Sequence, residues 1–127
     1  MKRGFTLVEL LAVIVLLGMI SLIVVPIVDK LIKENKENLY QTNIILIEEG
    51  ARSWAGDNIF SLPSEIGETK TLTICDLEKD GRIEVDIKNP KNGELFYKDS
   101  IVTITKTEYG FEYKYDENSG TESVKCE

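Results

Sequence analysis

The segment Leu10–Val28 contains no charged side chain, and this feature constrains the fold more than any other in the chain. As an α-helix its 19 residues would be about 28 Å long, close to the roughly 30 Å hydrocarbon core of a bilayer. Lys2 and Arg3 precede it, and by the positive-inside rule they keep that end in the cytoplasm. The sequence therefore predicts one membrane-spanning helix near the N-terminus.

Glu9 places a carboxylate at the start of this apolar segment. A charged side chain at the centre of a membrane helix costs at least about 2.5–3.5 kcal/mol on insertion scales, so it usually has a functional partner. Because Glu9 lies only about one turn inside the helix, snorkelling to the bilayer edge is the alternative. The residues around it, MKRGFTLVE, favour a functional partner.

Two other membrane-directed interpretations compete with this one. A secretory signal peptide needs a small-x-small cleavage site after its apolar stretch. Ala12, Gly18 and Ser21 each lack a small residue two positions away, and a carboxylate would be unusual in a disposable signal. A plain membrane anchor that is never cleaved stays possible on length and composition alone.

The N-terminal residues MKRGFTLVE and the apolar segment after them closely resemble the leader and start of type IV prepilins and pseudopilins, strongly through about Lys30. The resemblance implies that a prepilin peptidase cuts between Gly4 and Phe5 and then methylates the new N-terminus. It also implies that Glu9, the fifth residue of the mature chain, forms a salt bridge with the α-amino group of a neighbouring subunit and so sets the register of assembly.

Pro26 lies inside the predicted helix and cannot donate a hydrogen bond to the carbonyl of Leu22. We therefore expect a kink or a local loosening there. Pilins commonly carry a proline at the equivalent position, where the helix can loosen on packing into a filament. A proline that is simply tolerated in a membrane helix explains the residue nearly as well.

The resemblance implies a structural, non-enzymatic subunit of a type IV pilus-like filament: a pilin, a minor pilin or a pseudopilin. The implied partners are other such subunits, prepilin peptidase, and a membrane assembly platform with its ATPase. The chain would be a single-pass membrane protein before assembly and part of a cell-surface or extracellular filament afterwards. Adhesion, motility, DNA uptake and secretion stay open as roles. The rival is a membrane-tethered binding or enzymatic domain that does not polymerise and keeps Met1–Gly4.

Composition excludes several kinds of chemistry. The chain has 15 Lys and Arg against 22 Asp and Glu, and without Lys2 and Arg3 the balance is 13 against 22, a net charge of −9. Nucleic-acid backbone binding needs clustered basic residues, so no direct nucleic-acid partner is expected. With no histidine, imidazole-based acid–base catalysis and imidazole-based zinc sites are ruled out. We predict no cofactor.

The helix is expected to continue beyond the membrane, because Asp29–Ala55 contains no proline and only one glycine. Its first part, to Asn38, is polar on nearly every face. Apolar residues then recur at helical spacing, which is typical of an amphipathic helix. They are Tyr40, Ile44, Ile47, Ala51 and Trp54, with Ile45, Leu46 and Ala55 broadening the same face.

After Asp57 the pattern changes to short strands and turns. The predicted strands are 71–75, 83–87, 95–97, 101–105 and 111–115, with turns at 79–82, 89–93 and 107–110. The last two strands form the clearest hairpin, which needs a cover for stability. The stripe from Tyr40 to Trp54 is the obvious cover. This predicts an α+β fold, one long helix on a small antiparallel sheet, which is also the pilin architecture.

The predicted divisions of the chain are a leader at 1–4, a transmembrane and assembly helix at 5–28, an extended amphipathic helix at 29–58 and a globular β domain at 59–127. Cys75 and Cys126 both lie in the part predicted to face outward, where a disulfide is permitted. Their bond would close a loop of about 51 residues, worth about 4 kcal/mol by chain entropy. Pairing is favoured over two free thiols, although the sequence alone leaves both open.

Asp76, Glu78 and Asp80 precede Gly81 in a pattern that resembles the opening of a calcium loop. The twelfth position, where a bidentate glutamate is expected, is Ile87, and no helices are predicted around it. A solvated acidic turn is the favoured interpretation, and no metal site is predicted. An aromatic set could form a ligand surface, but its alternation favours a sheet face packed on the helix; it consists of Tyr97, Tyr109, Phe111, Tyr113 and Tyr115.

Overall fold

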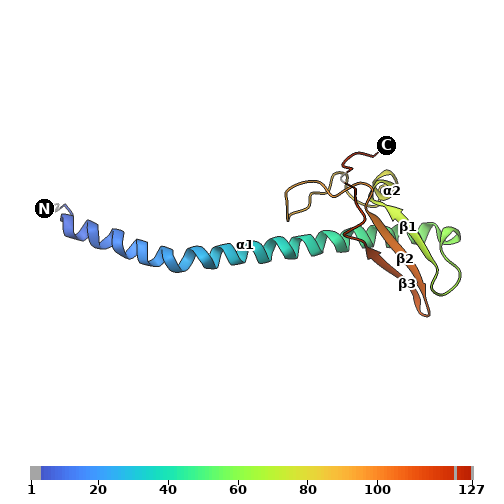
Figure 1. The fold of residues 1–127 in the computed structure, drawn as a ribbon, viewed down its shortest axis with the longest axis horizontal. Coiled ribbons are helices and arrows are strands. Elements are labelled where there is room, and N and C mark those ends of the chain that lie inside the picture. The colour runs from blue at the N-terminus through green and yellow to red at the C-terminus, as the bar shows by residue number, and fades with distance from the viewer. Residues whose placement is uncertain (1–3, 122, 127) are drawn as a thin grey trace. The chain divides into compact units, whose positions relative to one another are not determined.

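The computed structural model describes residues 4–121 and 123–126. The chain divides into two compact units, one ending at Lys36 and one beginning at Glu37. The elements, in chain order, are α1 Leu7–Asp57, the short 3-10 helix η1 Ile59–Ser61, β1 Thr69–Thr73, α2 Ile74–Lys79, β2 Ile101–Thr107 and β3 Gly110–Tyr115 (Figure 1).

The second unit is a two-layer α+β structure in which α1 packs on one face of a small antiparallel sheet, as predicted from the pilin-like pattern (Figure 1). The buried residues of α1 are Tyr40, Ile44, Ile47, Gly50, Ala51 and Ala55. Their spacing confirms the predicted stripe, with Trp54 half-buried at its margin. The prediction that Ile45 and Leu46 broaden this face is wrong, because their side chains are 57% and 55% exposed.

The sheet has the strand order β1-β2-β3, and each neighbouring pair is antiparallel. Leu72 pairs with Val102, which pairs with Tyr115 on the other side, so all three side chains point to the same face. These three residues and Ile104 are buried in the core. Alternate residues of β1 and β2 face away from α1, which is why one face is apolar and the other is largely threonine.

The predicted C-terminal hairpin is confirmed, with β2 and β3 joined at Glu108 and Tyr109. The aromatic residues of the hairpin differ in how deeply they are buried. Tyr115 is buried and meets the ring of Phe96 edge-on at 5.9 Å. Phe111 and Tyr113 are half-buried against the core. The placement of Tyr109 on the helix-facing side is wrong, because it is 98% exposed at the turn.

The strand predicted at 71–75 is displaced, because a helix begins inside it. Thr73 is the N-cap of α2: its hydroxyl accepts from Asp76 N at 3.1 Å, and the Asp76 carboxylate accepts from Thr73 N at 3.0 Å. This capping box satisfies two backbone donors at the helix start. The strand therefore ends at Thr73, and Cys75 belongs to α2.

The strands predicted at 83–87 and 95–97 are wrong. Asp86 has a φ of 58°, a left-handed conformation that does not occur in a regular strand. In the second segment only Leu95 pairs, through an isolated bridge to Lys88. The alternation at 83–87 instead reflects a loop folded against α1, where Ile83 fills space left by Gly50: a Cβ on that glycine would lie 2.4 Å from Ile83 Cγ2.

Polar contacts hold these loops to α1. Arg82 forms an ion pair with Asp57 at 2.6 Å and hydrogen bonds with Ser53. In the predicted turn at 89–93, Lys91 Nζ lies 3.0 Å from a Glu37 carboxylate oxygen and 4.0 Å from the centre of the Tyr40 ring.

Candidate processing and assembly site

The predicted cleavage site lies just ahead of the point where α1 begins. Gly4, Phe5 and Thr6 are not helical. Leu10 N donates to Thr6 O at 3.2 Å, and this bond opens the helical ladder. The Gly4–Phe5 peptide bond is therefore part of non-helical backbone immediately before Leu7, the first residue of α1.

Glu9 and Thr6 form a capping box at this helix start. Glu9 Oε2 accepts a hydrogen bond from Thr6 N at 3.1 Å, and Thr6 Oγ1 accepts one from Glu9 N at 3.2 Å. Each bond satisfies a backbone donor that has no partner within the helix. Thr6 is a site residue that the sequence reasoning missed, although the T-x-x-E spacing before an apolar run is a readable signature of this motif.

The capping box gives the Glu9 carboxylate a hydrogen bond but no cationic partner among the described residues. Among the residues that the structure describes, Glu9 takes part in no ion pair, and its side chain lies on an exposed part of the helix. A hydrogen bond from a neutral amide satisfies the carboxylate only in part, because a nearby positive charge stabilises an anion more strongly in an apolar layer.

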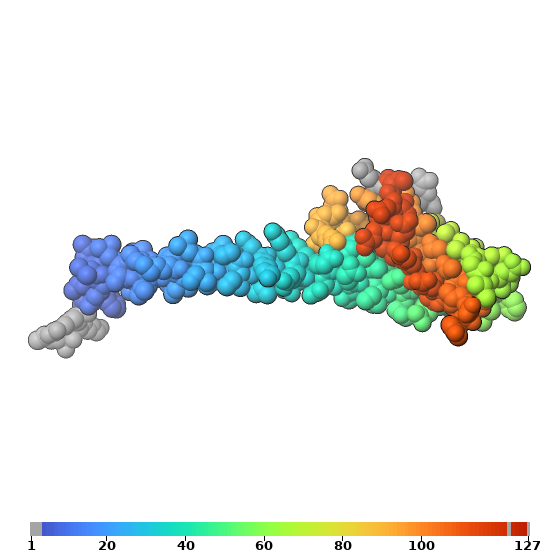
Figure 2. All heavy atoms as spheres, turned by 60° about the horizontal axis from the view of Figure 1, so that its bottom comes forward, coloured from blue at the N-terminus to red at the C-terminus, as the bar shows by residue number. Residues whose placement is uncertain are grey.

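The helix around Glu9 exposes a long apolar surface. Every described residue from Gly4 to Leu39 is exposed, and in Figure 2 the blue spheres of this segment are uncovered on the face shown. Of the part of the chain that is described, one helix, α1, is long and apolar enough to cross a membrane. This surface needs a non-aqueous surrounding, and membrane anchoring meets that need.

Pro26 lies within α1, and the helix is assigned continuously through it. Nearby, Ser21 Oγ donates to Leu17 O at 2.8 Å. Such back-bonding lets a polar residue sit in an apolar helix without an unsatisfied donor. The predicted kink at Pro26 stays a prediction.

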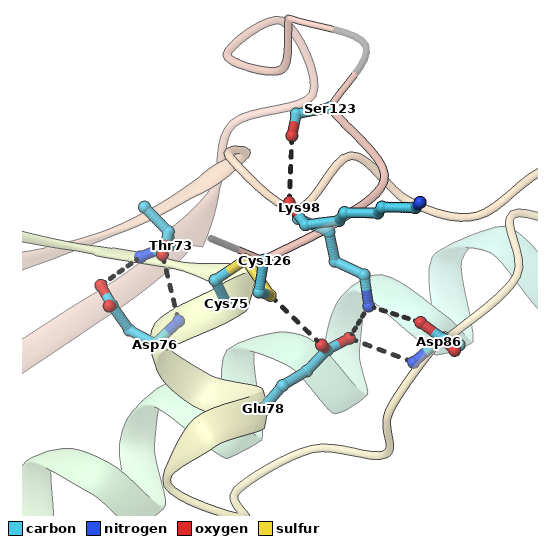
Figure 3. Close-up of a disulfide and its surroundings, with 9 residues drawn as sticks. Thr73, Cys75, Asp76, Glu78, Asp86, Lys98, Ser123 and Cys126 are labelled. Carbon is cyan, nitrogen blue, oxygen red and sulfur yellow. Dashed lines mark hydrogen bonds and ion pairs between the residues drawn. A yellow bond between two sulfur atoms is a disulfide. The ribbon is translucent and has the colours of Figure 1, made fainter.

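Cys75 and Cys126 lie at disulfide distance, with Sγ atoms 2.09 Å apart and Cα atoms 5.5 Å apart. Figure 3 shows the bond between the start of α2 and the C-terminal segment. Cys126 Sγ is also 3.6 Å from Glu78 Oε2. The disulfide therefore lies directly beside a charged side chain.

Glu78 belongs to a buried ion pair that sequence reasoning did not find. The side chains of Lys98 and Glu78 are 3% and 7% exposed and are in direct contact. Lys98 Nζ also lies 2.9 Å from Asp86 Oδ1 (Figure 3). Burial favours the neutral amine, but the hydrogen bonds and charges of Glu78 and Asp86 outweigh it and raise the pKa of Lys98 above its usual value. Lys98 is therefore an ammonium ion enclosed by two carboxylates.

The acidic residues considered for calcium serve three separate local roles. Asp76 caps α2, Glu78 pairs with Lys98, and Asp80 pairs with Arg82 at 2.8 Å. The interpretation of a solvated acidic turn is wrong for Glu78, which lies on α2 and is buried. No group of three or more metal-binding side chains comes together within residues 4–121 and 123–126.

Comparison with curated proteins finds no match, and comparison with solved structures finds none either. One family model does match, over residues 1–25, and its description is the prokaryotic N-terminal methylation motif. The matched range includes the predicted cleavage position, Thr6, Glu9 and most of the apolar segment. The chain thus carries the type IV prepilin-like signal motif at the start of a long apolar helix.

Proposed function

We propose that this protein is a structural subunit, a pilin, minor pilin or pseudopilin, of a type IV pilus-like filament. The observation that carries the proposal is the methylation motif over residues 1–25, together with an apolar helical segment, Leu10–Val28, that is exposed along its whole length. Such a surface suits a chain that moves from lipid into a bundle of identical helices. The motif also supports a non-enzymatic role.

In this proposal residues 1–4 are a leader that prepilin peptidase removes by cutting between Gly4 and Phe5, after which the Phe5 amine is methylated. Residues 5–28 are the membrane and assembly helix, 29–58 extend it, and 59–127 form the globular domain. The partners are other filament subunits, the membrane assembly platform and its ATPase. The subunit would be in the cell membrane before assembly and on the cell surface or outside it afterwards.

Glu9 is the proposed assembly residue. Its carboxylate is held by Thr6 N and has no cation among the described residues. The amine created at Phe5 of a neighbouring subunit would supply that cation within the same apolar layer, where water cannot replace it. The capping box fixes the direction of the side chain before the neighbour arrives.

Intact mass and N-terminal sequencing of the protein from its own host test the processing step. The expected chain begins at N-methylated Phe5. A Gly4→Leu variant should keep the whole leader, because a bulky side chain at the scissile bond blocks the peptidase. A wild-type chain that retains Met1, or a trimmed Gly4→Leu chain, would contradict the proposed cleavage and favour a tethered domain.

A further inference from the structure

The C-terminal segment, of which residues 116–121 and 123–126 are described, lies along the stretch 97–101 without forming a helix or strand with it. Ile101 N donates to Ser119 Oγ at 2.8 Å, and Thr121 N donates to the Asp99 carboxylate at 3.1 Å. Thr121 Oγ1 also donates to the Asp99 carboxylate, and this bond, followed by that from Thr121 N, lowers the pKa of Asp99 below its ordinary value. The contacts follow in antiparallel order, with Ser119 beside Ile101 and Thr121 beside Asp99.

The C-terminal segment packs closely on residues 97–101. A Cβ on Gly120 would lie 2.4 Å from Tyr97 Cδ2 and 2.7 Å from Ser100 Oγ. Farther along, Ser123 O accepts from Lys98 N at 2.6 Å (Figure 3). The segment therefore lies on the backbone of the same lysine whose ammonium group is buried with Glu78.

The Cys75–Cys126 disulfide joins the C-terminal segment covalently to α2. Apart from the packing of Gly120, the other contacts are hydrogen bonds, most of them at exposed residues, and each of these bonds competes with water. Cys126 lies at the end of the segment, and its sulfur is 3.6 Å from Glu78 Oε2. When the bond is closed, Cys126 helps to keep water from the Glu78–Lys98 pair.

The hydrophobic core takes no described side chain from the C-terminal segment, although Glu117 of that segment hydrogen-bonds with Tyr40 at the edge of the core. The buried core residues run from Tyr40 to Tyr115, and among the described residues none comes from 116–126. Ile47, Val102 and Ile104, which lie between α1 and the sheet, are fully buried, and all three come from α1 and β2 rather than from the segment. Loss of the segment should therefore leave the core folded.

We propose that the Cys75–Cys126 bond makes the described part of the C-terminal segment, residues 116–121 and 123–126, a redox-sensitive cover over the buried Glu78–Lys98 pair. When a dithiol reductant donates two electrons and two protons, the S–S bond breaks, two thiols form, and the reductant becomes a disulfide. The segment then leaves residues 97–101 and water reaches the ion pair. Reoxidation by a disulfide oxidant reverses each step. The chain has a closed form and an open form, and the core stays folded in both.

The open form corresponds to the reducing cytosol and the closed form to the oxidising exterior of the cell. Thiols stay reduced in the cytosol, while disulfides persist outside the cell. The cover would thus be open before the domain crosses the membrane and closed afterwards. This inference goes beyond the proposed filament role, because it describes a property of a single chain and can be tested without assembly.

Hydrogen exchange of the full chain in detergent micelles, with and without dithiothreitol, tests the inference, and alkylation of the thiols confirms reduction. We expect exchange in peptides covering 97–101 and 117–126 to accelerate at least tenfold on reduction. Peptides from 44–55 and from β2 should stay at least tenfold slower than these, although loss of the bond's loop-closure contribution speeds their exchange too. Cys75→Ser should show the open pattern with or without dithiothreitol.

Three results would overturn the proposal. Unchanged exchange at 97–101 after confirmed reduction would mean that the segment is held without the bond. Exchange as fast at 44–55 as at 97–101 after reduction would mean that the bond stabilises the whole fold rather than a cover. A bond that dithiothreitol cannot reduce in the folded protein would show that no switch exists. None of these results depends on whether the chain enters a filament.

Discussion

The unit ending at Lys36 and the unit beginning at Glu37 differ in whether the chain buries their apolar side chains. In the first, apolar residues are numerous and all the described ones are exposed, as Leu16 and Ile20 are at 58% and 56%. In the second, Ile47 and Ile104 are fully buried by the chain itself. The first unit therefore depends on other molecules to cover its surface, while the second supplies its own cover.

This difference predicts which measurement each unit controls. Substitutions in the first unit should change insertion or assembly and leave the unfolding of the second unit unaltered. Substitutions in the core of the second unit should change its free energy of unfolding. Each experiment below either separates the two behaviours or shows that they are mixed.

The largest expected effect is on assembly, through Glu9. Glu9→Ala should reduce the subunit in sheared surface filaments to background, because the neighbouring amine loses its counter-charge in an apolar layer. Membrane levels and leader removal should persist. The amount of subunit in filaments, normalised to its membrane level, is the measurement, or the number of filaments if the subunit acts only at initiation.

Two further variants separate the charge of Glu9 from its capping role. Glu9→Gln keeps a side-chain acceptor for Thr6 N but removes the charge, so it should fail like Glu9→Ala. Thr6→Ala removes the hydroxyl cap, worth about 1 kcal/mol, and keeps the charge, so filaments should persist. Filaments at wild-type level in both Glu9 variants would make it a tolerated boundary residue.

The next largest effect is on stability. Ile47→Ala should lower the free energy of unfolding of the second unit by about 2–5 kcal/mol, because it removes a fully buried side chain and leaves a cavity. Denaturant unfolding of the full chain in micelles, followed by Trp54 fluorescence, measures it. Ile45→Ala, at a 57% exposed site two residues away, is the matched control and should change it by less than about 1 kcal/mol.

The contrast between the units also explains what could be predicted from sequence. The membrane segment and the stripe from Tyr40 to Ala55 were predictable, because a long helix repeats its pattern many times. Thr6 and Thr73 carry readable capping signatures that went unnoticed. In both cases the threonine and its acidic partner, Glu9 or Asp76, lie three positions apart, so the local sequence is enough to identify the motif.

Other features depend on contacts between distant residues. The alternation at 83–87 suggested a strand, but Ile83 is held by the space beside Gly50, and that contact is invisible in the local pattern. Likewise nothing near Lys98 in the sequence identifies Glu78 as its partner, since the two are brought together only by the fold. Period-two patterns over five residues are too short to separate a strand from a packed loop.

Gly50 offers a smaller and sharper test of packing in the second unit. Alanine favours a helix interior over glycine by about 1 kcal/mol. At Gly50, however, the new Cβ would lie 2.4 Å from Ile83 Cγ2 and 3.0 Å from Arg82 O. Gly50→Ala should therefore destabilise the unit by about 1–3 kcal/mol, the usual range for overpacking.

Gly56 and Gly18 are the controls for this substitution, because a Cβ at either would meet nothing within 4 Å. Gly56→Ala should stabilise the second unit slightly, by up to about 1 kcal/mol. Gly18→Ala should leave its unfolding unchanged. A stabilising Gly50→Ala would mean that the 81–83 loop is not packed on α1.

The smallest expected effect is a titration at the start of the buried stripe. Tyr40 is 6% exposed and stacks on Phe96 with ring centroids 5.8 Å apart. Burial, followed by the negative charge of Glu117, raises the pKa of Tyr40 to about 12. In the unfolded chain the phenol ionises near its ordinary pKa of about 10. The contribution of neutral Tyr40 to stability is therefore complete below pH 10 and is lost as the pH rises from about 10 to about 12.

The difference in tyrosinate absorbance between the wild-type chain and Tyr40→Phe isolates this one phenol. Its midpoint should be near 12 in the folded protein and near 10 in denaturant. Tyr40 directly follows the last residue of the exposed run, Leu39. The titration thus reports whether burial by the chain itself begins at this turn of α1. A midpoint near 10 in the folded protein would show that Tyr40 is solvated, and the covered part of α1 would then begin farther along, toward Ile44.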